Sequence, residues 1–405
     1  MTQTPLLLTL VCLLYQRSRK FPTNRATLYE KALRVLLEEW AAEKCIPHED
    51  IYKGLDTKRK EMILSEVAHH AFQANRLFLP RREITDQIEQ LLKEMLPDEK
   101  FIDGTAVLNS IEVQHGVLVE RAEGIYSFSH LTLQEYLTAQ YIDDHRKIEA
   151  LVTGHLTDER WQEVFLLVAG LMRGGADELL LLMEKEAQKY INTPKLQALL
   201  RWAEQVTAGS QSNLKPVAKR AIANAIAKAI AIAKAYANAK AIAKAYAIAY
   251  AIAYANAITK AYAIAIAIAI ANAIANANAN ANANANANAN ANAITSTRKL
   301  EELNVFKDIN FTVVIAKLEA LKAKAPDDKQ PEEVRRAFAK QFVQTLQQGF
   351  RLNAELVNLS EEEAEAWKNY FYANSLMMQC KEAAVRVSPK TWEAIEARML
   401  LVPNN

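Results

Sequence analysis

The stretch FSHLTLQEYLTAQYI, residues 128–142, decides the fold of this chain. Just before it, residues 117–121 and 125–128 alternate in hydrophobicity around Ala-Glu-Gly at 122–124, which predicts a compact β-hairpin. Inside it, apolar side chains recur at spacings of three and four, which predicts one buried stripe of a helix. These are Leu133, Tyr136, Leu137 and Tyr141.

His130 lies in the turn between the predicted strand and the predicted helix. Thr132 and Glu135 have the T-x-x-E spacing of a capping box, with Ser129 as a competing cap. Free backbone N–H groups and the positive end of the helix dipole favour an anion at such a position. An imidazole donor there makes phosphate contact one interpretation, and a packed or solvated turn histidine is the other.

Phe128-Ser129-His130, with Gln134-Glu135-Tyr136 and Ala139, resembles the end of the winged-helix domain in NACHT-family signalling NTPases. In that family, the histidine of this motif contacts the β-phosphate of bound ADP and helps to hold the closed, inactive state. The resemblance therefore implies that His130 is a nucleotide contact.

Residues 4–10, TPLLLTL, with Phe21-Pro22 and residues 24–29, resemble the opening of the helical domain that follows the nucleotide-binding core in the same family. There, an asparagine-proline-leucine motif places the proline against the adenine, so the resemblance implies that Pro5 contacts the base. This chain has Thr4 in place of asparagine. From the residues alone, Thr4-Pro5 marks the start of a buried helix, because the apolar run lacks the flanks of a signal peptide and is too short to span a bilayer.

The length of 405 residues suggests two or three domains, and the net charge of +2 argues against a strongly electrostatic nucleic-acid binder. The three cysteines lack metal-ligand spacing, which predicts reduced thiols in a cytoplasmic protein. No histidine or cysteine cluster predicts a metal site.

The predicted fold class is mainly α. It comprises a helical domain, a winged helix with a short β-hairpin, a long alanine-rich helix and a C-terminal helical bundle. The predicted domains are a helical domain following the nucleotide-binding core (1–80), the winged helix (81–147), a second helical domain (148–215), a low-complexity repeat (216–297) and a C-terminal helical domain (298–405).

In the repeat, every odd position from Ala221 to Ala293 is alanine except Thr259, and the even positions are Ile, Asn, Lys or Tyr. A period of two is typical of a strand, but alanine is the best helix former and is depleted in strands. This favours one long helix that frays across residues 275–292 and serves as a spacer. An aggregating strand over residues 261–271 is the alternative, and that segment is too short for a membrane span.

In the C-terminal part, Ser360 and Glu363 predict the cap of a helix, and Ser388-Pro389 predicts the start of the last one. Residues 380–389, CKEAAVRVSP, with the WEAIE stretch at 392–396, resemble a C-terminal helical domain of bacterial, notably cyanobacterial, NACHT proteins. Cys380 has no histidine near it in sequence, which favours a buried structural thiol.

A winged helix can bind DNA, but the predicted recognition helix, residues 105–114, carries Glu112 and no Arg or Lys. Phosphate contacts need cations on the docking face, so the sequence favours a packing role.

The sequence contains no G-x-x-x-x-G-K-[ST] loop, and no apolar strand ends in the paired acids that hold magnesium. We therefore expect no catalysis by this chain alone. The resemblance implies the regulatory, sensor-side part of a NACHT-type signal-transduction ATPase that lacks its motor through a split gene, truncation or decay. ADP or ATP would bind once the ATPase half joins in cis or in trans, with oligomerisation on activation and a role in antiphage defence. The alternatives are a standalone helical scaffold and, more weakly, a winged-helix DNA binder.

Overall fold

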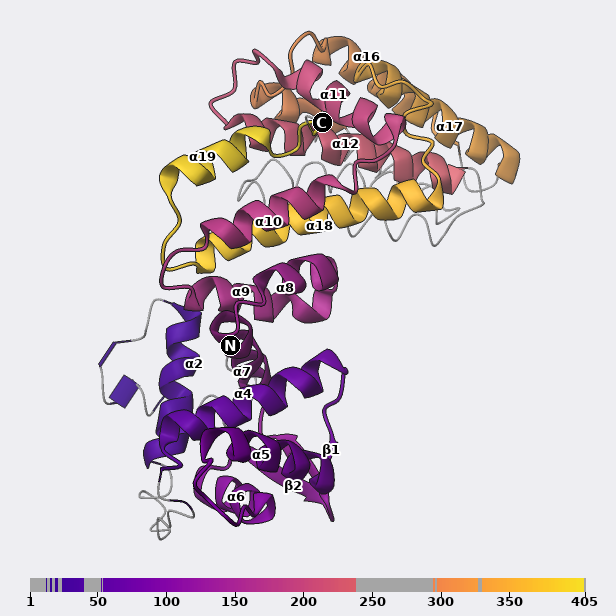
Figure 1. Cartoon of the computed structure of the whole chain (residues 1–405). Helices are drawn as coiled ribbons and strands as arrows, with labels where there is room; N and C mark the ends of the chain where they lie inside the picture. Colours follow the sequence, from indigo (N-terminus) through magenta and orange to yellow (C-terminus); the bar gives the residue numbers. More distant parts are fainter. Residues whose placement is uncertain are drawn as a thin grey trace. The chain divides into compact units, whose positions relative to one another are not determined.

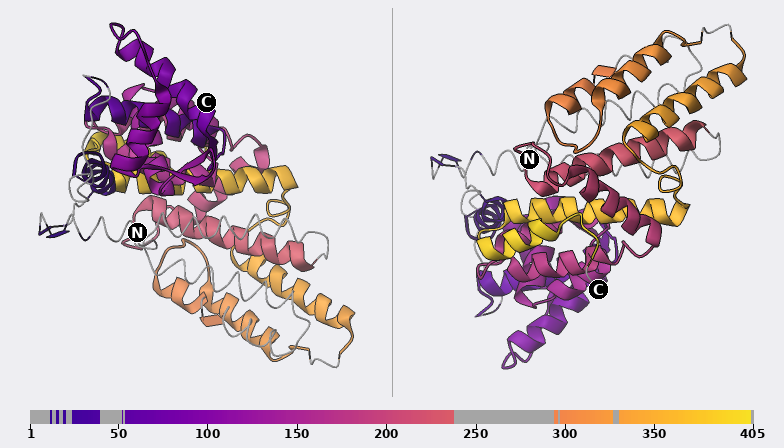
Figure 2. Two further views of the ribbon diagram at one scale, coloured as in Figure 1. Left: turned by 90° about the horizontal axis from the view of Figure 1, so that it is seen from below. Right: turned by 90° about the horizontal axis from the view of Figure 1, so that it is seen from above.

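The computed structural model describes residues 24–39, 54–237, 297–326 and 330–403, with positions 12, 15–16, 19–20, 52 and 294–295. The chain divides into two compact units (Figures 1 and 2). Unit 1 comprises Met1–Leu180 with Cys380–Val387, and unit 2 comprises Leu181–Gln379 with Ser388–Asn405. The described elements are helices and one small antiparallel sheet, which confirms the predicted mainly α class.

Two helices of unit 1 begin where an aspartate caps them: Asp56 accepts the Arg59 N–H at 2.9 Å, and Asp103 accepts the Thr105 N–H at 2.9 Å. Helix α7 packs on both α4 and α9 and forms the centre of this unit. The helices are α2 (Arg25–Arg34), the π-helical turn η1 (Val35–Glu39), α4 (Thr57–Gln73), α5 (Arg81–Met95), α6 (Gly104–Ser110), the π-helical turn η2 (Ile111–His115), α7 (Leu131–Asp144), α8 (Ile148–His155), the 3-10 turn η3 (Glu159–Trp161) and α9 (Gln162–Leu171).

The sheet of unit 1 has the order β1-β3-β2, with both pairs antiparallel. Strands β2 (Leu118–Ala122) and β3 (Ile125–Phe128) form the predicted hairpin, with a bulge between Glu120 and Ala122. Strand β1 (Leu79–Pro80) was not predicted, because two residues ending in proline carry no strand pattern. Helices α4 and α5 flank β1 in the chain, and α6, the β2–β3 hairpin and α7 follow. This order of elements is the winged-helix arrangement.

Glu112, on the segment that would read DNA, binds the wing of its own domain. Its carboxylate accepts the Glu120 N–H at 3.1 Å and the Tyr126 hydroxyl at 3.0 Å. Burial, together with this bond to Glu112, raises the pKa of Tyr126 to about 12. The predicted single helix over residues 105–114 is instead α6 followed by the wider π-helical turn η2, which ends at Gly116 in the left-handed region (φ 62°). These contacts favour packing as the role of this segment.

Unit 2 is entirely helical in the part that the structure describes. Helix α12 packs against α11, α17 and α19, and α16 lies beside α17, as Figure 2 also shows. The helices of this unit are the larger part of α10 (Asp177–Gln188), α11 (Pro194–Thr207), α12 (Pro216–Ala237), α16 (Phe311–Lys322), α17 (Glu332–Gly349), most of α18 (Glu361–Ala383), and α19 (Pro389–Arg398). Among the described helices of both units, none combines the length and apolar character that crossing a bilayer requires.

The first part of the alanine repeat lies in α12, so its predicted helix is confirmed there. The spacer role predicted for the repeat is wrong for this part, because its described side chains are buried on all sides in the core of unit 2. Alternation by two spreads the larger residues around a helix, and α12 contacts α11, α17 and α19 and, through Lys228, α18. Residues 238–293, where the rest of the predicted helix falls, lie outside the described residues.

Lys228 of α12 is fully buried against two rings of α18. Its Nζ lies 3.2 Å from the ring centroid of Phe371 and 5.2 Å from that of Trp367, so the cation faces aromatic π-systems. Burial lowers the pKa of Lys228 well below its ordinary value.

We expect Lys228→Met to flatten the alkaline pH dependence of stability. Because the folded pKa of Lys228 lies below its ordinary value of 10.5, the unfolded chain binds more protons between the two values, and stability rises with pH there. Methionine removes this rise. Urea unfolding at several pH values measures it, with the half-exposed Lys219→Met in the same helix as the control. Equal slopes in wild type and Lys228→Met would contradict the expectation.

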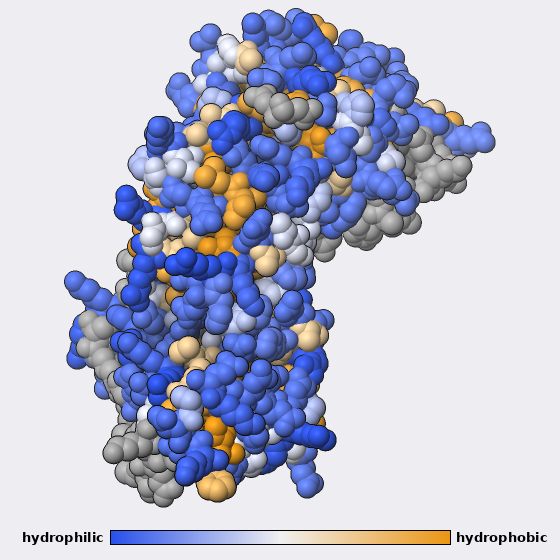
Figure 3. Space-filling view, viewed as in Figure 1, coloured by the Kyte–Doolittle hydropathy of each residue, from blue (hydrophilic) through white to orange (hydrophobic). Residues whose placement is uncertain are grey.

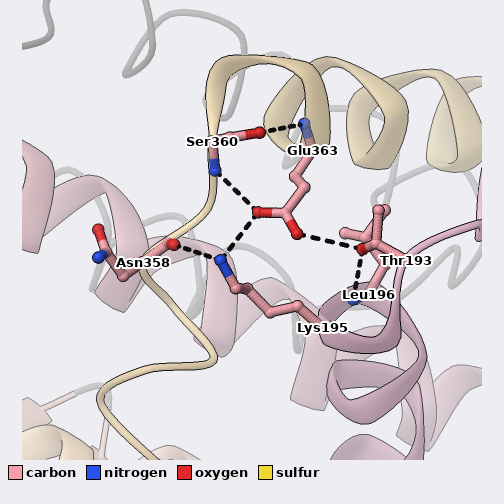
Figure 4. A network of polar contacts seen from close by, with 6 residues as sticks. All are labelled: Thr193, Lys195, Leu196, Asn358, Ser360 and Glu363. Carbon is pink, nitrogen blue, oxygen red and sulfur yellow. Dashed lines mark hydrogen bonds and ion pairs between the residues drawn. The ribbon is translucent and has the colours of Figure 1, made fainter.

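The N-termini of α11 and α18 meet at one carboxylate, that of Glu363 (Figure 4). The predicted capping box is present: the Ser360 N–H donates to Glu363 at 2.8 Å, and the Glu363 N–H donates to Ser360 Oγ at 3.1 Å. Thr193, the cap of α11, donates its hydroxyl to Glu363 at 3.1 Å, and Lys195 Nζ lies 2.9 Å from the same carboxylate. Lys195 Nζ also donates to the Asn358 carbonyl at 2.8 Å.

Candidate phosphate-contact site at His130

His130 links β3 to α7 and caps the first turn of that helix. Its backbone is extended (φ −146°, ψ 141°), as at most helix N-caps. The turn is fixed on the hairpin side by the Ser129 N–H, which donates to the Val117 carbonyl at 2.8 Å. The predicted position of His130, between a wing strand and a helix N-terminus, is confirmed.

The imidazole of His130 is oriented by Thr132. The Thr132 N–H donates to His130 Nδ1 at 3.1 Å, and the Thr132 hydroxyl lies 2.5 Å from the same nitrogen. A nitrogen that accepts a backbone N–H carries no proton, so the ring proton is on Nε2. Burial lowers the pKa of His130 below its ordinary value of 6.5, and the ring is therefore neutral at pH 7. A neutral Nε2–H is a suitable donor to a phosphate oxygen.

The capping box predicted from Thr132 and Glu135 is wrong, since His130 is the cap of α7. Thr132 lies inside the first turn, where its N–H is the group that is capped. Glu135 is only 9% exposed and does not reach back to the helix start. The competing cap, Ser129, is excluded as well, and its Oγ has no hydrogen-bond partner among the described residues. A T-x-x-E spacing cannot reveal that His130, two positions before Thr132, supplies the acceptor for the Thr132 N–H.

Glu135 belongs to a buried charge cluster with Arg25 and Glu163. Burial, with a smaller contribution from Glu163, raises the pKa of Glu135 to about 8, although Arg25 opposes the shift. Arg25 Nη1 lies 2.5 Å from Glu163 Oε2, so the guanidinium is committed to that carboxylate. At neutral pH, the cluster therefore holds the Arg25–Glu163 ion pair and a Glu135 that is largely protonated. This cluster supports α7 from the side that faces α2 and α9.

Arg121 is a member of the site that the sequence analysis missed. Its Nε donates to Ser127 Oγ at 2.9 Å, and its Nη2 donates to the Ser129 carbonyl at 3.4 Å. This places an exposed guanidinium beside the turn that carries His130. Arg121 is the extra residue of the β-bulge, between Glu120 opposite Tyr126 and Ala122 opposite Ile125, and a bulge has no reliable sequence signal.

Pro5, the second predicted nucleotide contact, lies outside the described residues, so its role stays a prediction.

A separate cleft of about 620 Å³ lies between α2, α4, α7 and α9 in unit 1. Its walls carry several carboxylates, including Glu61, Asp143 and Asp144, and burial raises the pKa of all three. His130 does not line it. Carboxylates outnumber the cations Arg34, Lys58 and Arg173 in this lining, which does not favour a phosphate there. Within the described ranges, no three metal-ligating side chains are close enough to hold a metal ion.

Helix α4, the three-stranded wing, α5, α6 and α7 define unit 1 as a winged-helix protein module. Residues 25–142 match the family model of the winged helix-turn-helix domain C-terminal to NACHT, and residues 314–402 match that of the NACHT C-terminal helical domain 2. The chain therefore carries two NACHT-associated domains, as the motifs around His130 and Cys380 predicted. No curated protein and no solved structure matches the chain.

We expect His130→Ala to lower the free energy of unfolding of unit 1 by about 1 kcal/mol, because the first turn of α7 loses its cap. His130→Asn keeps a capping acceptor and should stay within about 0.5 kcal/mol of wild type. Thermal and urea unfolding measure both variants. Equal losses in the two would show that the imidazole packs rather than caps.

Proposed function

We propose that this chain is the regulatory, sensor-side part of a NACHT-type signal-transduction ATPase that is switched by bound nucleotide. The observation that carries the proposal is His130, a neutral imidazole held at the strand-to-helix turn of a winged helix whose family is associated with NACHT. The match of the C-terminal helical domain to a second NACHT-associated family supports the same context.

The chemistry of the switch follows from the His130 turn. His130 Nε2–H donates to the β-phosphate of ADP, the α7 N-terminus contributes its positive dipole end, and Arg121 adds a cation beside the turn. Pro5 contacts the adenine. These three phosphate contacts, from His130, the α7 N-terminus and Arg121, favour retention of ADP when the winged helix lies against the nucleotide. They are lost when the winged helix moves away.

Hydrolysis belongs to a NACHT ATPase module that joins this chain in cis or in trans. The sequence has no phosphate-binding loop and no paired acids for magnesium, so it does not hydrolyse ATP by itself. The proposal extends to a cytoplasmic setting, oligomerisation after nucleotide exchange and a role in antiphage defence.

The test compares a NACHT module alone, the module with this chain, and this chain alone. We expect no ATP hydrolysis by the chain alone. We expect the dissociation of a fluorescent ADP analogue from the module to slow by about tenfold or more when the chain is fused to it or added. Unchanged dissociation, or hydrolysis by the chain alone, contradicts the proposal.

A helical scaffold that works without nucleotide is the second candidate. It is favoured by Glu112, because the segment that would meet DNA or a ligand is used for packing within the wing. Under this alternative, the chain would leave ADP dissociation unchanged and would be soluble and monodisperse without any NACHT module.

A further inference from the structure

A short segment of the C-terminal helical domain is part of unit 1. Residues Cys380–Val387 group with the winged-helix unit, whereas most of the matched range 314–402 groups with unit 2. We infer that the start of α2 and the end of α9 form a docking surface for this segment, and that the segment couples the C-terminal helical domain to the winged helix. We call this surface the Asn24 surface, made of Asn24, Gly170 and the Gly175–Ala176 backbone.

Asn24 uses both ends of its amide. Its Oδ1 caps α2 by accepting the Ala26 N–H at 2.7 Å and the Thr27 N–H at 3.4 Å. Its Nδ2 donates to the Ala383 carbonyl at 3.2 Å and to the Gly170 carbonyl at 3.4 Å. One side chain therefore joins the first turn of α2 to the last residue of α18.

Two glycines allow the backbones to approach at this surface. A Cβ at Gly170 would lie 2.9 Å from Ala26 Cβ, 3.0 Å from Asn24 Oδ1 and 3.4 Å from the Ala383 carbonyl oxygen. Gly175 has φ +109°, where side chains are strained, and its Cβ would lie 3.4 Å from the Arg386 carbonyl oxygen. Next to it, the Ala176 N–H donates to that Arg386 carbonyl at 3.0 Å. The surface thus lets the backbone of the segment that follows α18 approach closely, and this segment bends at Val385.

The coupling follows from the continuity of α18. This helix runs without interruption from Glu361 to Ala383, and its residues up to Gln379 belong to unit 2, where Trp367, Phe371 and Leu376 are buried. If α18 loses order in unit 2, the Ala383 carbonyl leaves Asn24, and the first turn of α2 loses a restraint. Helix α2 packs on α7, whose N-cap is His130. The contact between Asn24 and Ala383 therefore couples α18 through α2 to α7, the helix that His130 caps. This coupling requires no nucleotide.

Amide hydrogen exchange on the full chain tests this coupling. Leu376→Ala opens a cavity beside α18, and Leu318→Ala opens one of the same chemistry beside α16, also in unit 2. We expect Leu376→Ala to speed exchange at Ala26 and Ala176 by about tenfold or more, and Leu318→Ala to leave both within about twofold. If Leu376→Ala unfolds unit 2, as seen from exchange along α16, the milder Leu376→Val is used with Leu318→Val.

Asn24→Asp separates the capping of α2 from the hydrogen bond to Ala383. Aspartate keeps the acceptor for the first N–H groups of α2 but loses the Nδ2 donors. In this background, the effect of the Leu376 variant on Ala26 should fall to within about twofold. The inference is overturned if the Leu376 variant leaves Ala26 and Ala176 unchanged, if the Leu318 variant speeds them equally, or if Asn24→Asp does not reduce the effect.

Discussion

Glu363→Ala is expected to lower the free energy of unfolding of unit 2 by about 3 kcal/mol. One carboxylate serves two helix starts: it accepts the Ser360 N–H at 2.8 Å, the Thr193 hydroxyl at 3.1 Å and the Lys195 ammonium at 2.9 Å (Figure 4). Alanine removes a capping box and leaves Lys195 beside two helix N-termini with their positive dipole ends. Urea unfolding followed by tryptophan fluorescence measures the loss.

The matched control is Glu361→Ala, which removes an exposed carboxylate from the same first turn of α18. It should change stability by less than about 0.5 kcal/mol. A Glu363→Ala loss as small as that of the control would mean that the shared carboxylate is not a structural centre of unit 2.

The pH dependence adds a second check on Glu363. Burial raises its pKa, but the bonds from Ser360, Lys195 and Thr193 outweigh burial, and the net pKa is lowered below 4.5. The stabilisation is therefore present above pH 4.5 and is lost as the pH falls through the lowered value. Glu363→Gln should remove this acid-side loss.

Glu135→Gln is expected to stabilise unit 1 at alkaline pH by on the order of 3 kcal/mol. The folded pKa of Glu135, about 8, lies above its ordinary 4.5, chiefly because the carboxyl is buried and secondarily because Glu163 is close. With respect to this group, the wild type is therefore fully stable below pH 4.5 and loses stability as the pH rises from 4.5 through the folded value of about 8. Glutamine keeps the shape of the protonated acid and escapes this loss.

Urea unfolding from acid to alkaline pH measures the effect, with the exposed Glu149→Gln of α8 as control. The Glu135→Gln and wild-type curves should coincide below pH 4.5, diverge between pH 4.5 and about 8, and keep a constant separation above that pH. Parallel curves would contradict the assigned protonation of Glu135.

The sequence pattern predicted the elements that rest on local signals. The hairpin around Gly124, the apolar stripe of α7 and the Ser360–Glu363 capping box all appear as predicted. Cys380 is buried as expected, and burial raises the pKa of its thiol. Each of these depends on residues close together in the chain, where periodicity and cap spacing carry most of the information.

The features that were missed depend on contacts between distant residues. Strand β1 exists because β3 offers an edge, and the burial of the alanine repeat in α12 depends on the helices that surround it. At the candidate site, His130 was predicted from its motif, but its capping role needs the Thr132 geometry. Arg121, which contacts Ser127 and Ser129, is the extra residue of a bulge.

The protein surface also limits sequence-based inference about partners. On the face shown in Figure 3, most residues are hydrophilic, with apolar residues in small groups. The most exposed large apolar side chain among the described residues is Phe101, at 87%. Single exposed residues of this kind occur on most proteins and do not define a partner.

The most direct test of the nucleotide switch is ADP dissociation from a fusion of a NACHT module to this chain, compared between wild type and His130→Asn. Asparagine keeps the cap of α7 and removes the imidazole donor, so a change in dissociation is not a consequence of unfolding. The account predicts that ADP leaves the His130→Asn fusion about tenfold faster. Equal dissociation rates in the two folded fusions would contradict it.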